Sequence, residues 1–144
     1  MTIAEQIQAA NRGEHPRAIL KLESGWLMLG DVQPLEGYCV LIADPVVPSL
    51  NDLPEAQRLI YLRDMARVGD ALLAAFGASR INYEMWGNLD PTLHTHIVPR
   101  YRAEPDALRV LPPRQAYEWG KARAFDPVSD AGTIARLRTA LESH

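Results

Sequence analysis

Residues 93–100 read Leu93-His94-Thr95-His96-Ile97-Val98-Pro99-Arg100, with two histidines alternating with apolar and β-branched residues. Such alternation predicts a strand, and residues two apart on a strand point to the same face of the sheet. The imidazoles of His94 and His96 should therefore stand side by side, with their Cα atoms about 7 Å apart. Leu93 and Ile97 would point the other way and anchor the strand on the core.

Two imidazoles on one face of a strand are compatible with three interpretations. They can be surface residues without a special role. They can bind a metal ion, because His-x-His is a common ligand pair. The other ligands would then have to be acidic residues such as Asp31, Glu84 and Asp90, none of which stands at a recognisable spacing. In the third interpretation one imidazole is a nucleophile and the other positions a phosphate.

Further strands are predicted on both sides of this stretch. Each is a short apolar or alternating run bounded by turn-forming residues, and the runs at 26–29 and 38–42, joined by an eight-residue link, should pair antiparallel. The run before the histidines should form a hairpin with their strand, across a turn at 87–91. Four or five strands are predicted in all, at 19–23, 26–29, 38–42, 80–86 and 93–98.

The clearest helix signal lies between the third and fourth runs, 38–42 and 80–86. Asp52 is expected to be its N-cap, with Pro54 in the first turn, Glu55 at the capping-box position and Gly77 as the C-terminal stop. Apolar residues recur near the helical period and are predicted to face the core. They are Leu59, Leu62, Met65, Ala66, Leu72, Leu73 and Phe76.

The order of these elements predicts an α+β fold in one domain spanning residues 1–144. Strand and helix do not alternate, and neither GxGxxG nor GxxxxGK[ST] is present, which argues against a doubly wound nucleotide fold. Weaker patterns predict a helix at 2–11 and a short terminal helix at 130–141. Four prolines after residue 103 predict an irregular C-terminal extension over 103–144.

Composition narrows the class of protein. The net charge of -3 argues against a general affinity for nucleic acid or an anionic membrane. No stretch is apolar enough for a membrane span, and the N-terminus does not resemble a secretory signal, so a cytoplasmic protein is expected. The single cysteine, Cys39, cannot form an intramolecular disulfide and is expected to be buried.

The region around the histidines resembles the signature of the histidine triad (HIT) family. That signature has three histidines alternating with apolar residues on a strand, then two apolar residues and often Pro-Arg. The Pro99-Arg100 ending sets the register. His96 then matches the third histidine and His94 the middle one, while Thr92 stands in the place of the first.

Two other segments extend the resemblance to residues 22–102. Upstream, Asp31 and the turn from Pro34 to Gly37 precede an apolar strand, as in the family, and a Gly87-Asn88 turn precedes the signature. Residues 103–144 have no evident counterpart. The resemblance implies a HIT-like antiparallel sheet of about five strands, with one long helix packed on it and a shorter terminal helix.

The resemblance also implies a function. Members of the family are mostly nucleotide hydrolases and nucleotidyl transferases that act at an α-phosphate through a nucleotidyl-histidine intermediate, and they usually form homodimers. Here His94 would be the nucleophile and His96 would donate to a phosphate oxygen. Dinucleoside polyphosphates such as diadenosine tetraphosphate are the expected substrates, and nucleoside phosphoramidates belong to the same reaction class. The covalent step needs no cofactor, although a divalent metal can accompany the nucleotide.

Four further residues are candidates for nucleotide binding. Asp31 matches the family position that contacts the ribose hydroxyls, and a carboxylate accepts two hydrogen bonds well. Asn88 and Arg100 could contact phosphate, and Thr92 could hydrogen-bond through its hydroxyl. No residue is assigned to a metal.

Thr92 is the main departure from the family pattern, since threonine cannot act as an acid, base or nucleophile as imidazole can. The family's nucleophile is the middle histidine, so the covalent step need not be lost. Two alternatives nevertheless stay open. One is a catalytically weak or silent nucleotide-binding module, and the other is a metalloprotein that uses His94 and His96.

Overall fold

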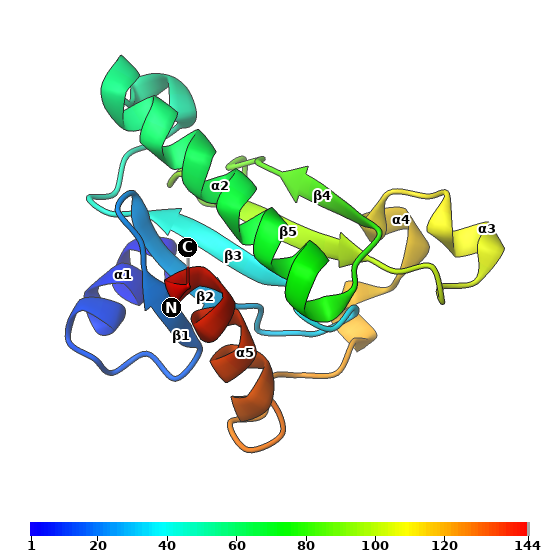
Figure 1. Cartoon of the computed structure of the whole chain (residues 1–144). Helices are drawn as coiled ribbons and strands as arrows, with labels where there is room; N and C mark the ends of the chain where they lie inside the picture. Colours follow the sequence, from blue (N-terminus) through cyan, green and yellow to red (C-terminus); the bar gives the residue numbers. More distant parts are fainter. Residues whose placement is uncertain (144) are drawn as a thin grey trace.

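A five-stranded antiparallel sheet runs through the computed structural model, which describes residues 1–143 (Figure 1). Its strands lie in the order β1-β2-β3-β5-β4. They are β1 Ala18–Lys21, β2 Gly25–Leu29, β3 Cys39–Ala43, β4 Arg80–Glu84 and β5 His94–Arg100. The antiparallel pairs predicted from the sequence, β2 with β3 and β4 with β5, are confirmed.

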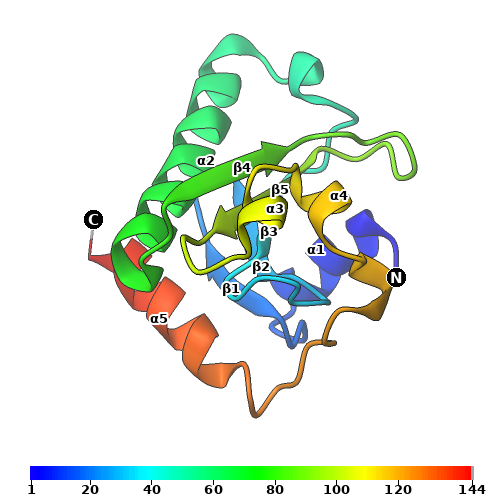
Figure 2. The same ribbon diagram turned by 90° about the vertical axis from the view of Figure 1, so that its right-hand side faces the viewer.

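The helices cover both faces of the sheet. Figure 2 shows α2 and α5 on one side and α1 and α4 on the other. Their bounds are α1 Ile3–Asn11, α2 Glu55–Phe76, α3 Asp106–Arg109, α4 Pro113–Ala116 and α5 Ala131–Glu142. Two short 3-10 helices lie at Leu50–Asp52 and Trp119–Lys121. The α+β architecture with one long and one terminal helix is therefore as predicted.

Alternation along the strands divides the buried residues between two layers. Leu27, Leu41 and Ile97 face α2 and α5 and belong to the larger core cluster. Met28 and Ile42 face the other way and pack against α1. His94 and His96 lie on this second face, opposite Ile42 and Val40 of β3. The helix α1 therefore covers the part of the sheet beside them.

The start of the long helix differs from the prediction. Asp52 lies in the preceding 3-10 helix, where its carboxylate accepts a hydrogen bond from the Ser49 hydroxyl. The helix begins at Glu55 after Pro54, without a side-chain cap. The predicted end is confirmed, since Gly77 adopts a left-handed conformation with φ of 69°.

The predicted core face of α2 is right only in part: Leu72 is buried and Met65 and Phe76 pack against the core, but three of the predicted leucines do not. Leu59, Leu62 and Leu73 are 60%, 39% and 41% exposed. Besides Leu72, the helix buries residues that the predicted stripe did not include, namely Tyr61, Asp64, Val68, Gly69 and Ala71. A buried aspartate is tolerated there because the Asp64 carboxylate accepts hydrogen bonds from Ser24 N and from Arg67. The helix carries apolar side chains around most of its circumference, so periodicity did not identify the side that packs against the sheet.

The C-terminal extension is more regular than predicted. Residues 103–121 form the short helices α3 and α4 and a 3-10 turn, and α5 packs against α2 and β1. The residues between α4 and α5 cross the sheet side on which α1 lies (Figure 2). Among residues 1–143, no helix has the length and apolarity needed to cross a bilayer.

Candidate active site

The two histidines lie on one face of β5, as their spacing predicts. Their ring centroids are 5.0 Å apart and their planes are nearly perpendicular. In the sheet, His94 stands opposite Ile42 and His96 opposite Val40. Between the histidines, Thr95 points to the other face, where its hydroxyl is 2.7 Å from the Tyr61 hydroxyl.

His94 is held in a defined tautomer by a backbone carbonyl. Its Nδ1 lies 2.6 Å from the carbonyl oxygen of Thr92, which can only accept a hydrogen bond. Nδ1 therefore carries the proton, and in the neutral ring Nε2 keeps a free lone pair. The carbonyl that provides this contact belongs to the backbone, so it is unaffected by the replacement of a histidine with Thr92.

His96 is held by a tyrosine. The Tyr38 hydroxyl lies 2.7 Å from His96 Nδ1, and the two rings are stacked with centroids 6.0 Å apart. Burial, then the nearby His94 and Arg114, lower the pKa of His96 to about 4, so the ring is neutral at pH 7. Burial raises the pKa of Tyr38, which keeps its hydroxyl protonated. When Tyr38 donates to Nδ1, the proton of His96 sits on Nε2, available to a ligand oxygen.

Asp31 and both histidines line one small cavity of about 150 Å³. Asp31 follows β2, whereas the histidines come from β5, so the sheet brings together residues more than 60 positions apart. The cavity is completed by residues of α1 and of the adjacent strands, namely Ile3, Gln6, Arg17, Tyr38, Val40 and Ile42. The predicted grouping of Asp31, His94 and His96 thus exists in the fold.

A second cavity, of about 260 Å³, opens on another side of His94. It is lined by Thr92 and Trp86 and by the segment Pro48–Asn51. The Thr92 hydroxyl donates to Asp90 Oδ1, whose other oxygen accepts a hydrogen bond from Ile3 N. Thr92 therefore helps to join the turn before β5 to the start of α1.

Asn88 is not part of either cavity. It lies exposed in the turn between β4 and β5 and is absent from the linings of both. Two other residues before β5, Trp86 and Gly87, line the second cavity together with His94.

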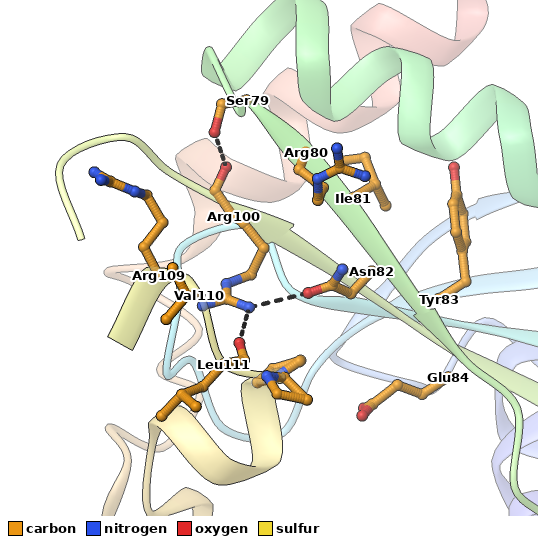
Figure 3. Close-up of a pocket in the computed structure, with 12 residues that line it drawn as sticks. Ser79, Arg80, Ile81, Asn82, Tyr83, Glu84, Arg100, Arg109, Val110 and Leu111 are labelled. Carbon is orange, nitrogen blue, oxygen red and sulfur yellow. Dashed lines mark hydrogen bonds between the residues drawn. The ribbon is translucent and has the colours of Figure 1, made fainter. Parts of the chain in front are cut away.

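Arg100 has a structural position and not the phosphate contact expected from the sequence. It is 4% exposed, and its guanidinium donates to Glu104, to Asn82 and to the carbonyls of Leu108 and Leu111. These bonds use all five N–H groups of the side chain. Figure 3 shows two of them, beside a separate recess of about 790 Å³ along β4 that contains no histidine.

The structure also identifies site residues that sequence reasoning missed. Tyr38 directly precedes β3 and reads from the sequence as an ordinary strand residue. Trp119 packs edge-on against the Tyr38 ring, with centroids 4.6 Å apart, and Arg114 stacks on Trp119. No spacing signal links these positions to the histidines, because the C-terminal segment reaches them only through the tertiary fold.

The metal interpretation finds no cluster of ligands in the described chain. Over residues 1–143, no group of three or more His, Cys, Asp or Glu side chains could hold a metal ion. The two histidines instead have hydrogen-bond partners that orient them, namely the Thr92 carbonyl and the Tyr38 hydroxyl.

Several solved structures with the same fold are histidine triad proteins. One from Bradyrhizobium japonicum has a TM-score of 0.71 and 23% identity, covering 86% of this chain and 89% of its own. One from Marinobacter aquaeolei has a TM-score of 0.71 and 20% identity, covering 96% and 94%. A hypothetical histidine triad nucleotide-binding protein from Sulfolobus tokodaii has a TM-score of 0.74 and 15% identity, covering 96% and 92%. No protein-family model and no curated protein matches the sequence. The chain has the histidine triad fold over nearly its whole length.

Proposed function

We propose that this chain, folded like the histidine triad proteins, is a nucleotide hydrolase or nucleotidyl transferase that acts at an α-phosphate. The observation that carries the proposal is the orientation of His94. Its Nδ1 is tied to the Thr92 carbonyl, its Nε2 lone pair is free, and it lines a cavity with Asp31 and His96. A neutral imidazole in this state attacks phosphorus without a metal.

The reaction follows in two displacements. Nε2 of His94 attacks the α-phosphorus, the N–P bond forms, and the P–O or P–N bond to the leaving group breaks with its electron pair on that group, a leaving nitrogen taking up a proton from solvent so that it departs as the neutral amine. Water, or another acceptor with an O–H group, then attacks the phosphorus. The N–P bond breaks with its electron pair returning to His94 Nε2, the acceptor's proton is lost to solvent, and the nucleoside monophosphate or its ester is released. His96 donates from Nε2 to a non-bridging oxygen as charge grows there. The exposed carboxylate of Asp31 accepts from the ribose hydroxyls.

The substrates that we propose are dinucleoside polyphosphates, with nucleoside phosphoramidates as the simpler alternative. The protein groups named above perform the covalent step without a metal, and a divalent ion carried by a polyphosphate is compatible with it. A silent nucleotide-binding module is the competing function, motivated by Thr92. The retained contact between His94 and the Thr92 backbone favours the enzyme.

A panel of substrates separates these two functions. We expect diadenosine tetraphosphate, or a nucleoside phosphoramidate, to release nucleoside monophosphate during incubation with the purified protein, as followed by chromatography. Binding of these nucleotides without turnover of any member of the panel would establish the silent module instead. Zinc or iron bound stoichiometrically, and lost when either histidine is replaced, would support the metalloprotein.

We further propose that the protein is a homodimer formed through α2 and β4. β4 is an edge strand, so one side of its backbone is unpaired within the chain. Beside it, Leu59, Leu62 and Leu73 form an exposed stripe at helical spacing, and Tyr83 of β4 is 44% exposed. A two-fold axis beside β4 would pair two copies of this edge and cover both leucine stripes.

A charge placed in the leucine stripe tests the dimer. The chain has a mass of 16.1 kDa, so sedimentation of the unmodified protein should show about twice that mass. Leu62→Glu combined with Leu73→Glu should give the monomer, because a dimer would bury four unpaired carboxylates. Leu89→Glu is the matched control, since Leu89 is fully exposed in a turn. A monomeric unmodified protein, or a dimer that survives both charges, would contradict the proposal.

A further inference from the structure

An arginine from the C-terminal segment lies beside the histidines without a role in the steps described so far. Glu84 stands directly opposite His96 in the β4–β5 register, so the two side chains share a face with Cβ atoms about 5 Å apart. Arg114 of α4 donates from Nε to Glu84 Oε1 at 3.2 Å. Its guanidinium is thereby placed next to His96, although the residues are 18 positions apart in the chain.

Arg114 is held in this position from two sides. Its guanidinium carbon lies 3.8 Å from the centre of the Trp119 ring, a cation–π contact. Trp119 is itself fixed, because its Nε1 donates to the Pro113 carbonyl and its ring packs against Tyr38. Tyr38 in turn contacts His96. An unbroken series of contacts therefore connects Arg114 to the histidine site.

The outer end of Arg114 remains available. The side chain is 42% exposed, and its Nη1 and Nη2 make no hydrogen bond to any part of residues 1–143. Glu84 occupies only Nε, so it orients the guanidinium and leaves the fork of the two Nη atoms available to a ligand. Such a fork is suited to phosphate oxygens, which it can bind in a bidentate manner.

The order of the strands places Arg114 on the β4 side of the histidines, opposite to the side on which Asp31 lies. The cavity with Asp31 lies over β3 and β5, where the proposed function puts the ribose and the α-phosphate. β4, which carries Glu84, is the next strand beyond β5. A nucleotide with its ribose at Asp31 and its α-phosphate at His94 can therefore extend its remaining phosphates over β4, towards Arg114.

We propose that Arg114 binds the phosphate next to the α-phosphate, and so makes the site selective for a polyphosphate leaving group over a neutral one. This inference rests on the proposed function. When the P–O bond to the α-phosphorus breaks, its electron pair stays on the oxygen of the departing phosphate. Arg114 stabilises the charge that develops there, whereas an amine leaving group offers it no anion.

Nucleotide binding tests Arg114 independently of turnover. In the His94→Asn background, which prevents hydrolysis, calorimetry compares AMP with ATP. We expect ATP to bind more tightly than AMP, and Arg114→Gln to weaken ATP about tenfold while changing AMP less than twofold. Arg114→Lys should restore part of the ATP affinity, because it keeps the charge and loses the fork. Arg63→Gln, an exposed arginine on α2 paired with Glu23, controls for the loss of one positive charge.

Turnover provides the second comparison. With His94 intact, Arg114→Gln should lower kcat/KM for diadenosine tetraphosphate about tenfold and leave that for a phosphoramidate with a neutral amine nearly unchanged. The inference would be overturned if Arg114→Gln lowered kcat/KM equally for both substrates, or lowered the affinity equally for AMP and ATP. Either result would show that Arg114 only holds the C-terminal segment in place. So would equal affinity of the parent protein for AMP and ATP.

The outcomes for the proposed function are different. If no substrate turns over but ATP is still preferred through Arg114, the enzyme proposal fails and the phosphate contact stands. If turnover proceeds and Arg114→Gln changes neither measurement, the enzyme stands and the contact fails. If neither nucleotide binds, both are overturned.

Discussion

Replacing His94 by asparagine is expected to lower kcat/KM for nucleoside monophosphate release by roughly 10³-fold or more, because the nitrogen that attacks phosphorus is lost. The amide of asparagine can still donate to the Thr92 carbonyl that holds His94 Nδ1 at 2.6 Å. The variant thus removes the nucleophile with little disturbance of the strand. Intact-mass spectrometry after brief exposure to substrate should show a nucleotidyl adduct on the unmodified protein and none on His94→Asn.

The neighbouring histidine is the matched control for this experiment. His96→Asn should slow turnover by removing a donor to the phosphate oxygen, yet still allow an adduct on His94. An adduct that persists in His94→Asn and disappears in His96→Asn would reverse the assignment of the nucleophile.

Replacing Arg100 by methionine is expected to lower the free energy of unfolding by about 3–5 kcal/mol, since it leaves the buried Glu104 carboxylate without its charged partner. Arg100 and Glu104 are both almost fully buried, and their oxygens and nitrogens are 3.0 Å apart at the closest. Arg100 also ties Leu108 and Leu111 of the C-terminal segment to β5. Urea unfolding followed by circular dichroism measures the change.

Two variants make this result specific to the buried pair. Adding Glu104→Gln to Arg100→Met should recover part of the lost stability, because the unpaired charge is removed while Tyr101 N can still donate to the side chain. Arg12→Met breaks an exposed ion pair with Glu14 and should have little effect. If Arg100→Met were no more destabilising than Arg12→Met, the structural role of Arg100 would be refuted.

The elements that could be predicted are those encoded by short-range pattern. The alternation around His94 and His96 was sufficient to place both imidazoles on one face, and the glycine at 77 was sufficient to end α2. The prediction failed where a pattern was ambiguous. Apolar residues occur on most sides of α2, and only the packing against the sheet selects Tyr61 and Val68 while leaving Leu59 exposed.

Among the candidate site residues, too, some predicted positions agree with the structure and others do not. Asp31 could be assigned through the segment it begins, and the structure does place it in one cavity with the histidines. Arg100 had the same sequence-level support, but its side chain is enclosed by Glu104 and the segment that follows it. Whether an arginine meets a ligand or a buried carboxylate depends on what covers it, and sequence spacing does not contain that information.

The sequence alone was thus enough to predict the strands, the long helix and the shared face of His94 and His96. The periodicity of a strand or helix is a local pattern that can be read over a few consecutive residues. The partners that orient those imidazoles required the folded chain. Tyr38 contacts His96, which is 58 positions away in the sequence. Trp119 of the C-terminal segment packs against Tyr38 and holds Arg114 beside the same histidine. Such contacts form only when separate segments pack together, and no local periodicity specifies which segment will cover which part of the sheet.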